Sequence, residues 1–288
     1  MLMSECPRRK SRSTRFGHRA VFICVCAGVL FLITTFGIAQ AGEKERPKVE
    51  VAVPFEFDFD FGAANGDAII NRWMPLVGFA IGGQWRLVNI AIFALADVTG
   101  GVPGRPGNPE PVQGSSVFGL TDLTVASFLT PPAKSENLVW GFGPVATIPT
   151  ATDDLLGSGK WLLGAAIRFA YRPGQWNLGA LMANQWSVAG DTDRADVNQL
   201  LIRGLIRRRL GGGWYFAYNP IITANWNAAS GQKWLIPLGG GIGKTFKIGS
   251  TQTAMSVQAY ANVVKPDGAP DGLIRVAFVL PIPQRLRR

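Results

Sequence analysis

The stretch FEFDFDF, residues 55–61, separates two fold classes because aromatic and acidic residues alternate in it without interruption. Successive side chains of a β-strand point to opposite faces, so the aromatics would share one face and the acids the other. The aromatics are Phe55, Phe57, Phe59 and Phe61, and the acids are Glu56, Asp58 and Asp60. A soluble β-protein buries such aromatics, whereas a membrane barrel turns them towards lipid and the acids towards a polar lumen. The rest of the chain must show which medium the phenylalanines face.

The N-terminal segment has the composition of a secretory signal. Residues 1–19 contain six basic residues and one acid, and residues 20–39 contain no charged residue. A small-x-small site, Ala39-Gln40-Ala41, follows before Gly42. This order is typical of a signal peptide, so we predict a signal over residues 1–41 that is cleaved between Ala41 and Gly42. An uncleaved membrane anchor is the alternative, because about 20 apolar residues can span a bilayer.

Removal of this segment changes the chemistry open to the chain. All three cysteines and the only histidine lie within it. It also holds six of the 29 basic and one of the 19 acidic residues, which leaves 23 and 18 and lowers the net charge from +10 to +5. Without Cys or His there is no thiol nucleophile, no Ser-His-Asp triad and no Cys/His metal site. We therefore predict no enzyme, no cofactor, no metal and no nucleic-acid partner.

Alternation of apolar and polar residues dominates the mature chain. It occurs in segments of about 10 to 14 residues between turn signals, which is the pattern of membrane β-barrel strands. The twelve predicted strands are 49–61, 68–81, 84–97, 117–130, 137–149, 159–172, 175–188, 197–209, 213–226, 232–247, 251–264 and 272–281. An even number of strands places both ends of the barrel on the same, periplasmic side.

The connections between these strands alternate in length. Long polar segments follow the odd-numbered strands, the longest being the 18 residues 99–116, and short turns such as Gly82-Gly83 follow most of the even-numbered strands. Outer-membrane barrels segregate their loops in this way, with long loops outside and tight turns in the periplasm. A soluble sandwich gives no reason for the segregation, and a soluble periplasmic barrel is the main rival fold.

Aromatic residues recur at strand ends. Trp214 and Trp226 are twelve residues apart on one face of a predicted strand. At about 3.3 Å per residue and a tilt of about 40°, they are separated by about 30 Å along the membrane normal. This separation suits two interfacial girdles. We predict an all-β fold: an antiparallel transmembrane β-barrel of about 12 strands, formed by residues 42–288 in the outer membrane of a Gram-negative-type bacterium. Its partners would be outer-membrane lipid, the barrel-assembly machinery and periplasmic chaperones.

Four ordered runs resemble a bacterial family. They are WGFGPVATIPTATDDLLGSGKWLLGAA (140–166), NQWSVAGDTDRADVNQLLI (184–202), GGWYFAYNPIITANWNAASGQKWLIPLGGGIGKTFKIG (212–249) and VQAYANVVKPDGAPDG (257–272). They resemble the outer-membrane proteins labelled "MetA-pathway of phenol degradation" or putative transporter, in places misnamed neuromedin U. The resemblance covers about residues 117–280 and implies an outer-membrane β-barrel that takes up aromatic or other hydrophobic compounds. Such barrels tend to finish on an aromatic final strand, whereas this chain continues past Phe278 as VLPIPQRLRR.

Two motifs suggest ligands and have simpler explanations. GGGIGKT, residues 239–245, approaches a phosphate-binding loop, but the Walker spacing needs glycine where Leu238 stands, and strand rather than helix is predicted to follow. Glycines on one face of a strand instead widen the lumen or let another segment approach closely. Acidic residues in the predicted external loops could hold calcium or bridge to lipopolysaccharide, but turn formation explains Asp beside Gly and Pro. These residues are Asp153, Asp154, Asp191, Asp193, Asp196, Asp267 and Asp271.

The candidate functional residues are charged side chains at predicted lumen-facing positions. The acidic ones are Glu56, Asp58 and Asp60, and the basic ones are Arg168, Arg172, Arg203, Arg207 and Arg275. With twelve strands, an acidic wall would face a basic wall and create a transverse field that orients polar solutes, while Arg275 pairs with the acidic row beside it. Alternatively, the charges pair with one another and fill a narrow lumen.

We predict passive passage of small-molecule solutes, hydrophobic or aromatic ones by resemblance only. The alternative is a non-conducting barrel that serves envelope structure or surface interaction through loop 99–116.

Overall fold

The computed structural model describes residues 49–279, apart from residues 65, 100–115, 133–134, 136 and 250. The predicted signal peptide with its Ala41–Gly42 cleavage site lies outside the described residues. So do most of loop 99–116 and the C-terminal end after Val279.

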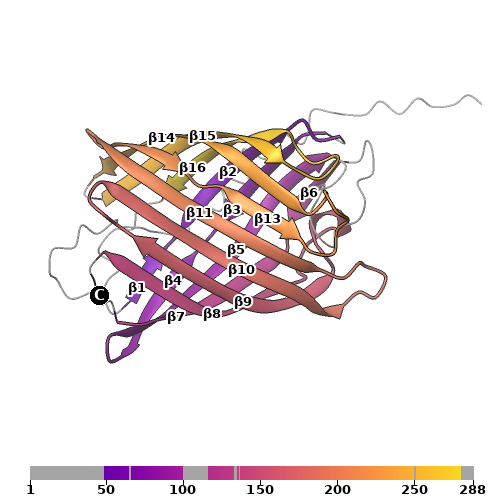
Figure 1. The fold of residues 1–288 in the computed structure, drawn as a ribbon, viewed down its shortest axis with the longest axis horizontal. Helices are drawn as coiled ribbons and strands as arrows, with labels where there is room; N and C mark the ends of the chain where they lie inside the picture. The colour runs from indigo at the N-terminus through magenta and orange to yellow at the C-terminus, as the bar shows by residue number, and fades with distance from the viewer. Residues whose placement is uncertain are drawn as a thin grey trace, which may run out of the picture. The chain divides into compact units, whose positions relative to one another are not determined.

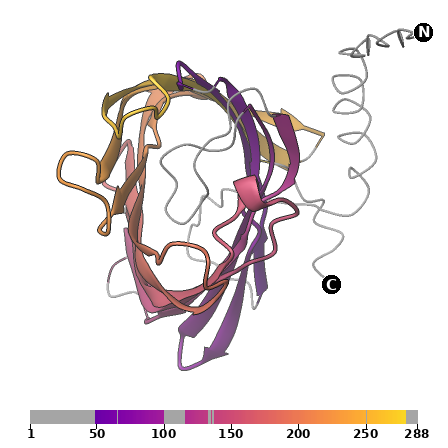
Figure 2. The ribbon, with the colours of Figure 1, turned by 90° about the vertical axis from the view of Figure 1, so that its right-hand side faces the viewer.

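The described residues form a closed antiparallel β-barrel of twelve strands, as predicted (Figures 1 and 2). The strand segments are β1 (Val49–Ala52), β2 (Pro54–Phe61), β3 (Ala68–Trp73), β4 (Leu76–Gly82), β5 (Trp85–Thr99), β6 (Ser116–Leu120), β7 (Leu123–Thr130), β8 (Leu138–Ile148), β9 (Lys160–Tyr171), β10 (Trp176–Gly190), β11 (Asn198–Gly211), β12 (Trp214–Tyr218), β13 (Ile221–Asn225), β14 (Trp234–Ile248), β15 (Thr251–Val264) and β16 (Gly272–Val279). The barrel closes where β2 pairs with β16, in a register that sets Asp58 opposite Arg275. No helix in the described part of the chain has the length and apolar character needed to cross a bilayer.

Four of the twelve predicted strands are broken into two segments, so the prediction of continuous strands was wrong there. The breaks fall at Val53, Met74–Pro75, Thr121–Asp122 and Asn219–Pro220. Proline has no N–H to donate to a strand ladder, which accounts for the breaks at Pro75 and Pro220. On both sides of each break the chain continues in the same direction, so each pair of segments counts as one barrel strand.

The tight turns lie together at one end of the barrel and the longer connections at the other, as predicted (Figure 1). Gly174 and Gly212 occupy turns with φ of 55° and 58°, a left-handed conformation that glycine adopts without steric cost. The connection from β8 to β9 contains a short 3₁₀ turn, η2 (Asp154–Leu156). The side chain of Leu156 is fully buried against Ala96 and Val98 of the wall, so this loop folds onto the inside of the barrel mouth.

The phenylalanines of FEFDFDF face outwards. Phe59 and Phe61 are 41% and 45% exposed, whereas Glu56 and Asp58 are 4% and 2% exposed. The exterior also carries exposed tryptophans at Trp85, Trp140, Trp161, Trp176, Trp186, Trp214 and Trp226. An apolar exterior with tryptophans among its exposed residues is what a barrel presents to lipid.

The inward face of the wall carries two kinds of side chain, apolar ones on one side of the interior and charged or polar ones on the other. An apolar group consists of the buried residues Val88, Ala126, Phe128, Val145, Ala166 and Ala183 on β5 and β7–β10. Charged and polar side chains from β2, β3, β11, β15 and β16 gather on the other side. We call the first set the apolar group and describe the second below.

Candidate functional site

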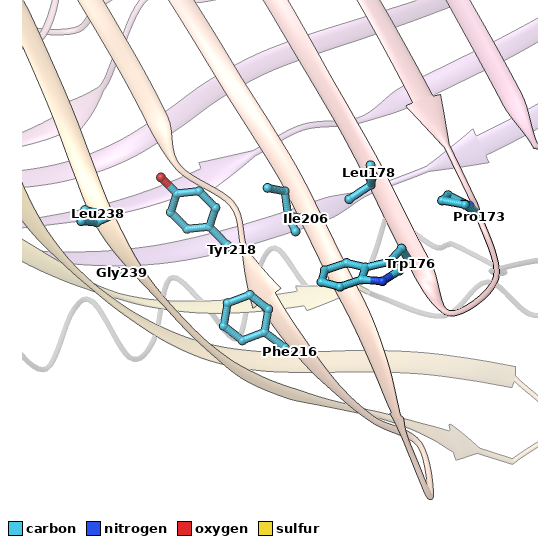
Figure 3. A pocket seen from close by; sticks show the side chains of 8 residues that line it. All are labelled: Pro173, Trp176, Leu178, Ile206, Phe216, Tyr218, Leu238 and Gly239. Atoms are coloured by element: carbon cyan, nitrogen blue, oxygen red, sulfur yellow. The ribbon is translucent and has the colours of Figure 1, made fainter.

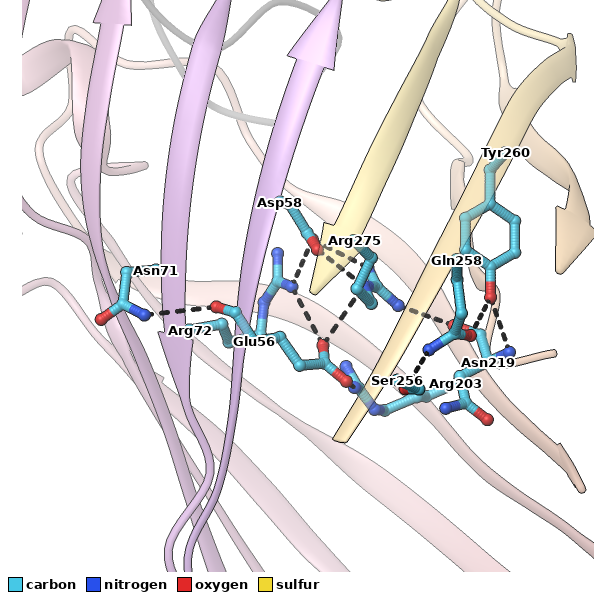
Figure 4. Close-up of polar contacts among 10 residues, drawn as sticks. All are labelled: Glu56, Asp58, Asn71, Arg72, Arg203, Asn219, Ser256, Gln258, Tyr260 and Arg275. Atoms are coloured by element: carbon cyan, nitrogen blue, oxygen red, sulfur yellow. Dashed lines mark hydrogen bonds and ion pairs between the residues drawn. The ribbon is translucent and has the colours of Figure 1, made fainter. Parts of the chain in front are cut away.

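Five charged side chains form an ionic cluster inside the barrel: Glu56 and Asp58 of β2, Arg72 of β3, Arg203 of β11 and Arg275 of β16 (Figure 4). Strand register brings most of them together. Glu56 lies directly opposite Arg72, and Asp58 directly opposite Arg275. Residues opposite each other in an antiparallel pair share a face, so all four side chains point the same way.

Asp58 is held from both sides. Arg275 donates to it through Nε (2.6 Å) and Nη2 (2.8 Å), a bidentate geometry that fixes both side chains. Arg72 donates to the same carboxylate through Nη1 (2.8 Å). The side chains of Arg275 and Asp58 are only 1% and 3% exposed, so this pair is removed from bulk solvent.

The contact between Arg203 and Glu56 crosses the lumen. Arg203 Nη2 donates to Glu56 Oε1, although the two residues lie on strands that are not neighbours. Along the barrel wall, four strands separate β2 from β11 in one direction and six in the other. A direct side-chain contact between them therefore spans the interior, and the opposite walls touch at this level.

A row of polar side chains extends the cluster along β15. Arg275 also donates to the backbone oxygen of Asn219 (2.7 Å). The backbone N–H of Asn219 donates to the hydroxyl of Tyr260 (2.7 Å). Tyr260 donates in turn to Gln258 (2.6 Å), and Gln258 to Ser256 (3.0 Å). Figure 4 shows these groups as one connected set from β3 to β15.

The structure thus brings together four of the eight predicted residues, Glu56, Asp58, Arg203 and Arg275. The others are placed elsewhere. One carboxylate oxygen of Asp60 is buried and accepts no hydrogen bond.

The remaining arginines contact aromatic rings or lie near the turns. Arg168 donates to Thr130 (3.2 Å) and lies 5.4 Å from the ring centre of Phe128. Arg207 lies 5.1 Å from the ring centre of Tyr215. Arg172 is exposed in the turn after β9.

Sequence reasoning missed Arg72 and the polar row of Asn219, Tyr260 and Gln258. Arg72 could have been found from register, since an antiparallel hairpin with its turn over 62–67 sets it opposite Glu56. Asn219 could not, because its position depends on a break in its strand.

The glycine-rich stretch 239–245 lies wholly within strand β14, and no helix follows it. Of the two explanations for its glycines, the structure supports close approach. A side chain at Gly243 would collide with the ring of Tyr215, whose hydroxyl donates to the backbone oxygen of Met255 (3.1 Å). Gly243 therefore makes room for an inward-pointing tyrosine.

The acidic loop residues have local structural partners. Asp153 accepts from the N–H of Leu155, and Asp191 from the N–H of Asp193, both at 2.9 Å. In the ranges that the structure describes, no group of three or more His, Cys, Asp or Glu residues could hold a metal ion. Asp196 accepts from Ser187 (3.1 Å) and Lys160 (3.3 Å), and these two contacts lower the pKa of Asp196.

Comparison with solved structures finds one outer-membrane barrel of similar fold and two weaker similarities. The chain is similar to an outer membrane channel from Pseudomonas putida F1, with a TM-score of 0.58 and 15% identity over 84% of this chain and 99% of that one. The NanC porin gives a TM-score of 0.48 with 10% identity over 81% and 100% of the two chains. The translocator domain of the autotransporter NalP from Neisseria meningitidis gives 0.38 with 8% identity over 92% and 95%.

No family model and no curated protein sequence matches the chain, so membership of the phenol-degradation family stays a prediction. The fold and the apolar exterior together place this chain among the barrels of the Gram-negative outer membrane.

Proposed function

We propose that the protein is a channel for the passive passage of small aromatic or otherwise hydrophobic compounds, and that the ionic cluster is its gate. The observation that carries this proposal is the contact of Arg203 with Glu56 across the lumen. It is the point where the opposite walls meet, so a solute that crosses the barrel must displace it.

A barrel with a purely structural role has little need of such a cluster. Buried ion pairs contribute little net stability, because the loss of hydration offsets much of the attraction between the charges. Apolar residues like those of the apolar group would close the interior equally well. Charged side chains at a constriction, by contrast, select and gate solutes.

The solute class rests on the sequence resemblance and is supported by the interior itself. Across the interior from the ionic cluster, the apolar group with Val88, Phe128 and Val145 is buried inside the barrel, so part of the interior is apolar. The charges that we assign to the lumen carry an excess of arginine, which favours anions among the ions that leak through. They are Arg72, Arg168, Arg203, Arg207 and Arg275 against Glu56, Asp58 and Asp60.

The test is planar-bilayer conductance of residues 42–288 refolded in detergent. We expect discrete steps with anion preference, a larger conductance for Arg203→Gln because the cross-lumen contact is lost, and a weaker anion preference in that variant. Glu56→Gln should also enlarge the conductance but strengthen the anion preference. Arg208→Gln is the control, because Arg208 lies beside Trp176 on the outer face (5.4 Å from the ring centre).

The contact of Arg203 with Glu56 also favours a second function, that of a non-conducting barrel, because walls that touch close the lumen. Folded protein with no conductance in the wild type and in both variants would contradict an aqueous channel. Uptake of an apolar fluorescent probe by cells that produce the protein would then separate a path for hydrophobic solutes without continuous water from a non-conducting barrel with a structural or surface role.

A further inference from the structure

The connection from β8 to β9 turns into the barrel instead of extending away from it. Its residues 150–158, which we call the inner loop, contain the 3₁₀ turn η2. Figure 2 looks into the end of the barrel with the longer connections, which we call the loop end, and η2 lies there beside the strands of the N-terminal half. Leu156 of η2 packs against residues of β3 and β5 on the inner side of the wall. The inner loop therefore occupies part of the opening through which a solute would enter.

One carboxylate closes the inner loop at its base. Asp122 lies at the break between β6 and β7. Its Oδ1 accepts from the N–H of Ala151 (3.1 Å), and its Oδ2 accepts from the N–H (2.8 Å) and the hydroxyl (3.1 Å) of Ser158. Ala151 and Ser158 lie at the two ends of the inner loop. Asp122 therefore fixes both ends of the loop to the wall.

The edge of β6 holds the first part of the inner loop. β6 pairs with β5 along one edge, and the loop lies along the other. Leu120 accepts from the N–H of Thr152 (3.1 Å) through its backbone oxygen, and its own N–H donates to Thr152 Oγ1 (2.9 Å). The N–H of Leu123 donates to Thr150 Oγ1 (3.0 Å). The loop thus supplies partners that backbone groups at a strand edge require.

Packing and an arginine hold the tip of the inner loop. The side chain of Leu156 is fully buried. Arg194, from the connection between β10 and β11, donates to the backbone oxygens of Asp154 (3.1 Å) and Gly157 (2.5 Å). Its side chain is only 12% exposed. A segment with buried contacts at its base, edge and tip opens at a high cost in free energy, so the inner loop acts as a fixed part of the mouth.

The largest apolar groove in the described part of the chain lies away from this path (Figure 3). It has a volume of about 540 Å³, and Trp176, Phe216 and Leu238 are among the residues that line it. These three side chains are exposed on the face that meets lipid. A solute in water at the loop end therefore meets the inner loop and not the groove.

We propose that the inner loop is a size filter at the mouth of the channel, and that Asp122 is the residue that positions it. Selectivity of a pore depends on its diameter as well as on its charges. The inner loop sets the cross-section of a solute that can enter, whereas the ionic cluster acts on a solute that has already entered. Asp122 contacts the loop and not the solute, so it is a positioning residue. The inference rests on the proposed channel function and adds the size limit of its solutes.

The experiment measures this size limit by polymer exclusion. Residues 42–288 are refolded in detergent and inserted into a planar bilayer, and polyethylene glycols of graded mass are added on the loop side. A polymer that enters the channel lowers the conductance, and a polymer that is excluded does not. Asp122→Asn keeps one side-chain oxygen, so the N–H of Ala151 or that of Ser158 loses its acceptor. We expect larger polymers to enter this variant than enter the wild type, and its conductance without polymer to increase.

Two further variants separate position from charge and from folding. Asp193→Asn is the matched control, because it removes the same charge from an exposed residue of the connection between β10 and β11. Its size limit should equal that of the wild type. Leu156→Ala loosens the tip of the inner loop and leaves Asp122 and the strand break unchanged. It should admit larger polymers in the same way, even where Asp122→Asn fails to fold.

A disulfide tests whether movement of the inner loop causes the change. A β-carbon at Gly119 would lie 3.4 Å from that of Thr152, which is close to the separation across a disulfide. Residues 42–288 contain no cysteine, so an introduced pair has no competitor. Gly119→Cys and Thr152→Cys are therefore added to Asp122→Asn. Oxidation should return the size limit to that of the wild type, and reduction should raise it again.

The outcomes distinguish the filter from the channel. Equal size limits in conducting wild type, Asp122→Asn and Leu156→Ala would overturn the filter and leave the channel standing. A size limit that stays raised in the fully oxidised pair would show that another part of the mouth had moved, and would also overturn the filter. Absence of conductance in the wild type would overturn the aqueous channel on which the filter depends.

Discussion

The apolar group and the ionic cluster close two sides of one interior by different means. Phe128 is fully buried among small and branched side chains from neighbouring strands. Arg275 is equally buried, but it is held by two bonds to Asp58 and one to Asn219. Packing is non-directional and tolerates exchange of similar shapes, whereas a buried charge depends on each partner. The comparison teaches that loss of one partner should cost more on the ionic side than a change of shape costs on the apolar side.

The largest effect should follow the loss of one partner from the ionic cluster. Arg275→Ala leaves Asp58 with Arg72 as its remaining cation and frees the oxygen of Asn219. We expect the free energy of unfolding to fall by about 3–5 kcal/mol, because a buried carboxylate loses one of its two guanidinium partners. Urea unfolding in detergent, followed by the heat-modifiable gel band, measures this change.

The control for this variant is Arg208→Ala, which removes an arginine from the outer face near Trp176. Its unfolding free energy should stay close to that of the wild type. Equal losses in the two variants would show that burial and pairing of Arg275 do not distinguish it from a surface arginine.

A smaller effect should follow a change of shape on the apolar side. Val145→Ala removes two methyl groups that pack in the apolar group, so we expect a loss of about 1.5 kcal/mol with the ion preference unchanged. Unfolding and bilayer conductance of the same preparation test both halves of this expectation. A changed ion preference would mean that the apolar side also lines the ion path, and the division of the interior would then be wrong.

Much of the fold follows from local patterns. The alternation in FEFDFDF fixes which face of the first strand meets lipid, and Gly/Pro turns mark the boundaries of the twelve strands. These features can be predicted from the sequence because strand period and turn geometry are properties of short segments.

The parts that sequence reasoning missed depend on contacts between distant segments. The contact of Arg203 with Glu56 joins residues 147 positions apart, and it requires the width of the lumen, which no single strand encodes. The break between β12 and β13 falls at Pro220, and Pro237 lies at a register shift in the neighbouring strand β14, so two prolines of separate strands affect the same stretch of wall only once the register is known.

The smallest effect should appear at the loop end, away from both sides of the interior. Asp196 is exposed, and hydrogen bonds from Ser187 and Lys160, with the charge of Lys160, lower its pKa below the ordinary range of an aspartate. A lowered pKa stabilises the folded loop at neutral pH, and this contribution is lost as pH falls through the folded-state pKa. The N–H of Val197 bonds to Ser187 Oγ (3.1 Å), so its hydrogen-exchange protection reports on the contact.

We therefore expect protection of the Val197 amide to be constant from neutral pH down to the ordinary aspartate range and to decrease below it. In Asp196→Asn the protection should be lower at neutral pH and should not change across that acid range, because no carboxylate remains to titrate. The barrel amides of β9 and β10 are the internal control, since the loop contact does not hold their ladder. Protection that falls at the same pH in the variant and the wild type would assign the acid transition to another group, and the loop would then be held by its backbone bonds, such as that from Ser187 to Val197 (2.8 Å).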